Sequence, residues 1–102
     1  MEEIILTQEN FKGEVLESNV PVLIDFWATW CGPCMMLSPT IKEIAEESDG
    51  SYKVGKVNVD EQGVLAAMYN ISVIPTIVVV KNGNEAGRTS GVQSKESIKA
   101  LL

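Results

Sequence analysis

The sequence predicts an α/β fold in which helices flank a single mixed β-sheet, with elements in the order β-α-β-α-β-α-β-β-α. Short apolar runs typical of strands buried on both faces alternate with segments whose apolar residues recur at helical spacing. Asn82-Gly83 lies between two strand-like runs and indicates a tight hairpin. No linker, repeat or low-complexity segment interrupts the 102 residues, so we expect a single domain over residues 1–102.

The first half of the chain supplies two predicted strands and two predicted helices. Ile4-Ile5-Leu6 is a short strand, and Thr7 is placed to cap a helix that runs to about Ser18. One face of this helix is apolar and consists of Phe11, Val15 and Leu16. Val22–Ala28 is apolar on both faces, as expected of a central strand. The next helix begins near Cys31, and its apolar side comprises Leu37, Ile41, Ile44, Ala45 and Ser48.

The second half adds three strands and two helices. A second central strand is expected from Tyr52 to Val59, and Asp60 is placed to cap a helix whose apolar face comprises Val64, Leu65 and Met68. Ile77–Val80 and, after the hairpin turn, Glu85–Thr89 are the last strands. Ser94 opens a final helix with the inward residues Ile98, Leu101 and Leu102. Strands separated by helices imply right-handed parallel crossovers, and the hairpin adds an antiparallel edge.

Charge and hydropathy exclude two classes of partner. The net charge is −6 and no basic cluster occurs, so we expect no binding to nucleic acid, which needs cationic side chains along the phosphates. The longest apolar run, Ile77–Val80, is far too short to span a bilayer. Met1-Glu2-Glu3 is acidic where a signal peptide is basic. We therefore expect a cytoplasmic protein with no membrane association.

The chain has only two cysteines, Cys31 and Cys34, and residues three apart on a helix are neighbours. A disulfide between them would stabilise the fold by only about 2 kcal/mol, because closing so short a loop removes little entropy from the unfolded chain. In a reducing compartment such a pair is catalytic or metal-binding rather than structural. A zinc site needs four ligands and the chain has no histidine, so we expect no metal. An iron–sulfur cluster shared between subunits fits the cysteine count, but the strand-turn-helix context disfavours it.

A redox-active disulfide at Cys31 and Cys34 fits the position of the pair at the start of a helix. Unpaired backbone N–H groups there favour the thiolate of Cys31, which is the nucleophilic form. Cys34 lies one turn further in, placed to resolve a mixed disulfide formed at Cys31. Gly32 allows close approach of a partner, and Pro33 fits the first helical turn, where its missing N–H costs little.

The string Trp30-Cys31-Gly32-Pro33-Cys34, preceded by Asp25-Phe26-Trp27-Ala28, resembles the active site of the thioredoxin family. The resemblance covers nearly the whole chain. It implies the thioredoxin fold and a protein thiol–disulfide oxidoreductase, acting mainly as a reductase of client proteins that contain disulfides. It further implies a monomer with no bound cofactor. The protein would be re-reduced by a thioredoxin reductase that draws on NADPH or another donor.

Asp25 and Lys56 are polar residues inside two strands that should be central. Burial raises the pKa of a carboxyl group, which suits Asp25 as a proton acceptor near neutral pH. The alternative is an Asp paired structurally with a lysine. The resemblance implies an Asp25–Lys56 pair that assists proton transfer at Cys34, whereas the pattern alone equally describes Lys56 as a surface lysine with a buried stem.

Pro75 follows Ile74 at the start of a strand. The residues alone predict a trans bond, since only about 5–6% of X–Pro bonds in folded proteins are cis. The resemblance implies instead a cis-proline loop beside the cysteines, where the backbone of Ile74 pairs with an extended substrate segment. Trp27 is expected in the core. Trp30 is expected on a docking surface together with Gly32, Pro33, Ile74, Pro75 and Gly91.

Two departures from the common family pattern bear on partner choice. Met35 stands where a lysine is usual, and Val73 replaces a smaller residue.

Two other functions stay open. A disulfide oxidase or isomerase typically carries a histidine between the cysteines, so Gly32-Pro33 argues against it, as does the lack of an export signal. A non-redox binding subunit of a larger assembly is not excluded.

Overall fold

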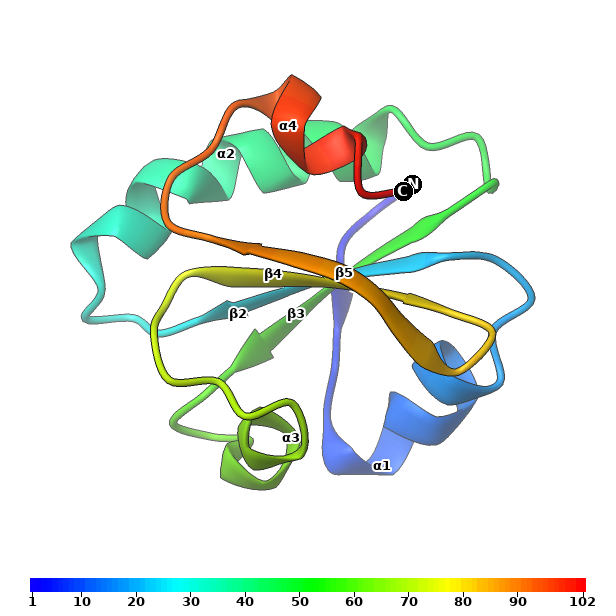
Figure 1. Ribbon diagram of the computed structural model, residues 1–102, viewed down its shortest axis with the longest axis horizontal. Helices are drawn as coiled ribbons and strands as arrows, with labels where there is room; N and C mark the ends of the chain where they lie inside the picture. Colours follow the sequence, from blue (N-terminus) through cyan, green and yellow to red (C-terminus); the bar gives the residue numbers. More distant parts are fainter.

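The apolar runs form the five strands of one mixed sheet in the computed structural model, which describes residues 1–102 (Figure 1). The strands occur in the spatial order β1-β3-β2-β4-β5. Their bounds are Ile4–Ile5 for β1, Val22–Trp27 for β2, Lys53–Asn58 for β3, Thr76–Lys81 for β4 and Asn84–Ser90 for β5. Strand β2 is therefore the middle of the sheet, as the sequence predicts for its continuous apolar run. Pairing with β3 on one side and with β4 on the other holds β2 in place.

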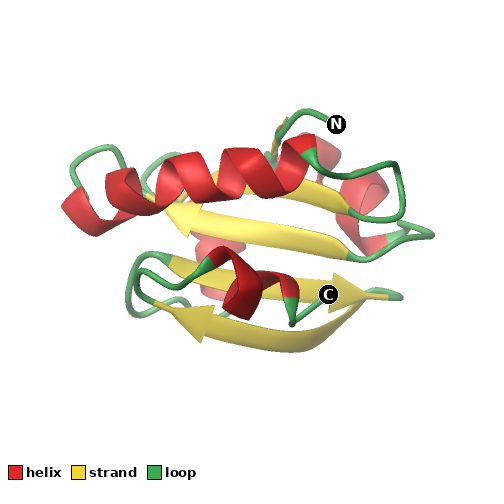
Figure 2. Cartoon of the chain, turned by 90° about the horizontal axis from the view of Figure 1, so that it is seen from above, coloured by secondary structure: helices red, strands yellow, loops and turns green.

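The helices form one layer on each face of the sheet. Helices α2 (Gly32–Glu46) and α4 (Lys95–Lys99) cover one face, as Figures 1 and 2 show. The other face carries α1 (Gln8–Phe11), the π-helical turn η1 (Lys12–Leu16) and α3 (Gly63–Met68). The predicted order of strands and helices and the mixed α/β sheet are confirmed. None of the helices combines the length and the apolar composition that a bilayer crossing requires.

Alternating side chains of β2 contribute to both core layers. Val22, Ile24 and Phe26 pack in the layer beneath α1, η1 and α3. Leu23 packs in the other layer, which also contains Leu37, Ile41 and Ile44 of α2 and Ile98 of α4. Since side chains alternate along a strand, Asp25 shares the face of Leu23. A carboxyl group thus lies on the apolar face that α2 covers.

The direction of β4 differs from the prediction. Strands β1, β2 and β3 are mutually parallel as expected, but β4 pairs antiparallel with β2, although α3 precedes it. Helix α3 has only six residues, or about 9 Å, whereas a six-residue strand spans about 20 Å. The connection therefore does not carry the chain back along β3, and β4 starts at the end of the sheet where β3 finishes. The active-site loops gather at this end.

Two helices differ in detail from the prediction. The helix after Thr7 is α-helical for one turn only and continues as η1, in which the N–H of Glu17 donates to the carbonyl of Lys12 at 2.9 Å. Glycine favours such irregularity because it is a poor helix former, and Gly13 lies within this turn. Leu16 is more than one-third exposed, so it lies at the rim of the predicted apolar face.

Helix α3 does not bury the face predicted for it. Its N-cap is Gln62 rather than Asp60, and of its three large apolar side chains only Leu65 is buried. Val64 and Met68 are each more than half exposed. These two residues are four apart and share a helix side, which turns away from the sheet. Leu65 is the one fully buried residue of this short helix.

The C-terminal predictions are confirmed. The hairpin between β4 and β5 turns through Asn82 and Gly83, both with positive φ, the geometry that favours Asn-Gly in two-residue turns. Ser94 caps α4 by accepting a hydrogen bond from the N–H of Ser97 at 3.1 Å. Ile98 is buried, and the half-buried residues Leu101 and Leu102 pack beside it.

A substitution at Gly55 can test how tightly β3 is packed. It lies between Ile4 and Ile24 in the sheet, and a Cβ atom there would lie 2.8 Å from Cγ of the buried Leu6. We expect Gly55→Ala to lower the free energy of unfolding by about 1–3 kcal/mol through overpacking. Gly63→Ala is the control, since its Cβ meets nothing within 4 Å. Urea unfolding measures both, and equal midpoints for the two variants would contradict the predicted clash.

Candidate active site

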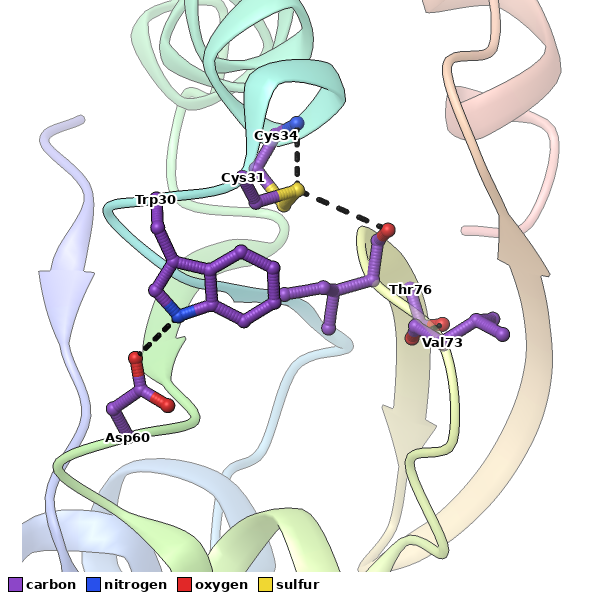
Figure 3. Close-up of a disulfide and its surroundings, with 7 residues drawn as sticks. Trp30, Cys31, Cys34, Asp60, Val73 and Thr76 are labelled. Carbon is purple, nitrogen blue, oxygen red and sulfur yellow. Dashed lines mark hydrogen bonds between the residues drawn. A yellow bond between two sulfur atoms is a disulfide. The ribbon is translucent and has the colours of Figure 1, made fainter.

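The two cysteines lie at the junction between β2 and α2. Cys31 is the N-cap of α2, with Pro33 in the first helical turn, which confirms the predicted helix start. The backbone N–H of Cys34 donates to the sulfur of Cys31 at 3.2 Å (Figure 3). The sulfur thus occupies the place where a serine or aspartate oxygen usually caps a helix. A cysteine at this position meets partial positive charge from the helix.

Cys31 and Cys34 form a disulfide, with Cα atoms 5.2 Å apart. Both residues are buried, and together with Ala28 they form a small cluster bordered by the half-buried Trp27 and Ile74. Cys31 is 5% exposed and Cys34 2%. Cys31 is therefore slightly the more exposed residue of the two. Gly32 and Pro33, between them, are exposed.

The loop before β4 lies against the disulfide. Its Ile74–Pro75 bond is cis, as the resemblance implies and contrary to the expectation from the residues alone. The carbonyl oxygen of Ile74 lies 3.9 Å from the sulfur of Cys31. Pro75 is buried, and its carbonyl accepts a hydrogen bond from the N–H of Gly91 at 2.9 Å. Contacts across the sheet hold this loop, which is why local preference does not decide its conformation.

The structure places the exposed Trp30 at the rim of a shallow groove. Trp30 is 70% exposed, and its indole N–H donates to Asp60 at 2.8 Å, so Asp60 orients this ring instead of capping α3 (Figure 3). The groove has a volume of about 190 Å³ and is lined by Trp30, Val59, Ile71, Ser72, Val73 and Ile74. Val59 and Ile71 belong to this surface in addition to the docking residues predicted from the sequence. Their apolar character gave no signal to distinguish them from core residues.

Asp25 is buried beneath α2 without a hydrogen bond to its Oδ1 atom. Burial raises the pKa of Asp25 from 3.8 to about 7, against the opposing positive charge of Lys56 and with a further contribution from the negative charge of Glu3. The predicted elevation of this pKa follows from desolvation of the charged form. The carboxyl group titrates near neutral pH.

Lys56 neighbours Asp25 in the sheet, but its ammonium group points elsewhere. The register pairs the two residues on adjacent parallel strands. The Nζ atom donates to Ser38 at 3.4 Å and lies 4.6 Å from the centroid of the Trp27 ring. No ion pair within 4.0 Å joins Lys56 to Asp25 among the five in the chain. Lys56 therefore acts on the carboxyl group through space.

The predicted docking residues converge on one end of the sheet. Trp30, Gly32 and Pro33 come from the β2–α2 junction, and Ile74 and Pro75 precede β4. Gly91 follows β5 with a positive φ of 80°. Met35 and Met36 in the first turns of α2 are exposed as well. No group of three or more metal-binding side chains occurs in the structure.

Comparison with known proteins identifies the family. The model of the Thioredoxin family matches residues 2–102. The chain is 50% identical over 93 residues to the thioredoxin of Rickettsia felis, covering 91% of this chain and 89% of that protein. It is 45% identical over 97 residues to the thioredoxin of Pyropia yezoensis and to thioredoxin 1 of a Nostoc species, covering 95% of this chain and 91% of each. The chain therefore belongs to the thioredoxin family of protein-disulfide oxidoreductases, and Cys31 and Cys34 are its redox-active disulfide pair.

Proposed function

We propose that this protein reduces disulfides of client proteins, with Cys31 as nucleophile and Cys34 as the resolving cysteine. The observation that carries the proposal is the helix-capping position of Cys31 beside an exposed apolar groove. Cys31, the slightly more exposed residue of the pair, is then the one that a client disulfide reaches first. The opposite order would require a client to reach the more deeply buried Cys34.

In the first step the thiolate of Cys31 attacks one sulfur of the client disulfide. A bond forms between the two sulfurs, the client S–S bond breaks, and the second client sulfur leaves as a thiolate that takes up a proton. Trp30, Gly32, Pro33, Ile74, Pro75 and Gly91 form the proposed docking surface. The backbone of Ile74 pairs with an extended client segment, which brings the client sulfur beside Cys31.

In the second step Cys34 resolves the mixed disulfide. Asp25 accepts the thiol proton of Cys34, and the resulting thiolate attacks the sulfur of Cys31. The bond between Cys31 and Cys34 forms, the bond between Cys31 and the client breaks, and the client sulfur leaves as a thiolate that takes up a proton. A pKa of about 7 suits this proton transfer at neutral pH. Lys56 limits the rise of the pKa of Asp25 through its positive charge. The closed disulfide of the structure is the product of this step.

The cycle needs an electron donor. We propose a thioredoxin reductase that draws on NADPH or another donor, in the cytoplasm, with residues 1–102 acting as a single monomeric domain. The protein would thereby take part in electron transport and cell redox homeostasis. The family membership supports this proposal, because proteins of this family normally work with a reductase and with disulfide-containing clients.

The redox potential of the Cys31–Cys34 pair tests the direction of electron flow. Equilibration against dithiothreitol buffers, followed by the fluorescence of Trp27 and Trp30, should give a value below that of the cytosolic glutathione pool, about −220 to −260 mV by extraction. The two tryptophans border the disulfide and should report its opening. A potential clearly above this range would instead identify a disulfide oxidant.

Replacing the resolving cysteine should trap clients. In Cys34→Ser the first step proceeds and the second cannot, so we expect mixed disulfides through Cys31 to accumulate and turnover to be lost. Non-reducing electrophoresis and mass spectrometry of the linked peptides measure this. The matched control is Cys31→Ser, which should trap much less because Cys34 is shielded. Equal trapping by the two variants would mean that the assigned roles are wrong.

Asp25 should make stability depend on pH. Its pKa is about 7 in the folded protein and near 3.8 when unfolded, so the folded state binds the proton more tightly. The stability contributed by the protonated form is complete below about pH 4 and is lost as the pH rises through 7. Asp25→Asn stays neutral, so it should exceed the original protein in free energy of unfolding by up to about 4 kcal/mol above pH 7. Denaturant unfolding of the oxidised proteins between pH 4 and 8.5 measures this, and parallel curves would contradict it.

A further inference from the structure

Glu3 is half-buried, and its carboxyl group has one oxygen, Oε2, that is withdrawn from solvent and that the mechanism above does not use. Only two buried side-chain oxygens in the protein lack a hydrogen-bond partner, Oδ1 of Asp25 and Oε2 of Glu3. None of the ion pairs of the chain includes Glu3. An acidic side chain near a terminus normally extends into water, where its charge is solvated. The Oε2 atom of Glu3 is instead withdrawn from solvent.

The strand register places Glu3 on the same face as Asp25. Ile4 and Ile5 of β1 pair with Gly55 and Lys56 of β3, so Glu3 precedes the paired residues by one position. Ile4 packs in the layer beneath α1, so the alternation turns Glu3 to the opposite face, toward α2. Lys56 in turn pairs with Asp25 of β2. Glu3 and Asp25 thus lie on one face of three neighbouring strands, with Lys56 on the strand between them.

The surroundings of Glu3 allow its negative charge to act on Asp25 without direct contact. Glu3 lines a hollow of about 420 Å³ between the N-terminal segment and the second half of α2, together with Glu2, Lys42, Ala45 and Glu46. Although this hollow opens to solvent, the Oε2 atom of Glu3 lies outside water contact. Charges separated by buried protein are screened less than charges separated by water. The negative charge of Glu3 also adds to the elevation of the pKa of Asp25.

We propose that Glu3 is a positioning residue for the redox reaction, whose negative charge on the α2 face of the sheet strengthens Asp25 as a proton acceptor. The inference rests on the proposed role of Asp25 at Cys34. The charged groups that act on Asp25 are Lys56 of β3 and Glu3 before β1. The elements packed around Asp25 carry other charged residues, namely Lys53 of β3, Lys42, Glu43 and Glu46 of α2 and Lys81 of β4. Lys56 opposes protonation of Asp25, and Glu3 counteracts Lys56. Burial raises the pKa of Asp25 most, and the two charges adjust it, so that the carboxyl group titrates near the pH at which a thiol must lose its proton.

The test is a titration of the side-chain carboxyl carbon of Asp25 by NMR in the full-length oxidised protein, assigned with Asp25→Asn. Glu3→Gln keeps the shape and removes the charge, so we expect the pKa of Asp25 to fall by roughly half a unit. Glu3→Asp keeps the charge and changes the shape, so the pKa should stay near its original value. Glu2→Gln removes the same charge from the exposed neighbouring residue and should leave the pKa unchanged. Thermal unfolding confirms that each variant is folded.

An unchanged pKa in Glu3→Gln, or an equal fall in Glu2→Gln, would overturn the inference. Equal effects of Glu3→Gln and Glu3→Asp would overturn it too, since they would indicate a purely structural role. Added salt sharpens the comparison, because 0.5 M salt should abolish a surface effect and leave a buried one in place.

The kinetic measurement links the titration to the reaction. Cys31 is converted to its mixed disulfide with thionitrobenzoate, and attack by Cys34 releases the coloured thiolate. We expect the midpoint of the pH profile of this release to move down in Glu3→Gln by the same amount as the pKa. An unmoved midpoint alongside a shifted titration would overturn the inference. The proposed function is judged separately: if Asp25→Asn releases the thiolate with the original pH profile, the assigned role of Asp25 is wrong whatever Glu3 does.

Discussion

The junction between β2 and α2 is the constraint on which the site depends. Strand β2 is bonded to β3 on one side and β4 on the other, so its end is fixed by the whole sheet. Helix α2 is anchored beyond the cysteines by the buried Leu37, Ile41 and Ile44. Only the short turn between these two elements carries the sulfurs. The disulfide can therefore open and close on a scaffold that the core holds in place, since the core is independent of that bond.

Asp25 shows that this site is not arranged for maximal stability. A buried carboxyl group next to a lysine would normally form a tight ion pair, which lowers its pKa. Here the ammonium group of Lys56 lies on Ser38 and over the Trp27 ring, so desolvation outweighs attraction and the pKa rises. Above neutral pH the buried carboxylate is charged, and this lowers the stability of the folded state. In return the site has a group that can take up and release a proton at neutral pH.

The parts of the fold that local sequence determines were predictable, and the parts that depend on tertiary arrangement were not. The apolar run of β2, the Asn82-Gly83 turn and the start of α2 at Cys31 follow from residue type and spacing. The direction of β4 depends on how far a short helix carries the chain, which periodicity does not encode. Val64 and Met68 satisfy a helical pattern without reaching the sheet. At the site, the cysteines were evident from spacing, whereas the cis bond before Pro75 came only from resemblance.

The groove beside the cysteines is suited to many clients under the proposed function. Its walls are mostly apolar, and the polar groups that the sulfur of Cys31 meets are backbone groups, the N–H of Cys34 and the carbonyl of Ile74, rather than charged side chains. Hydrogen bonds to backbone groups recognise the extended conformation of a client segment and do not depend on its side chains. The hydrogen bond to Asp60 holds the Trp30 ring, so this wall is ordered before a client arrives. The exposed Met35 and Met36 add flexible, polarisable surface that adapts to different side chains. Selectivity would then come from the net charge of −6, which repels acidic partners, more than from the shape of the groove.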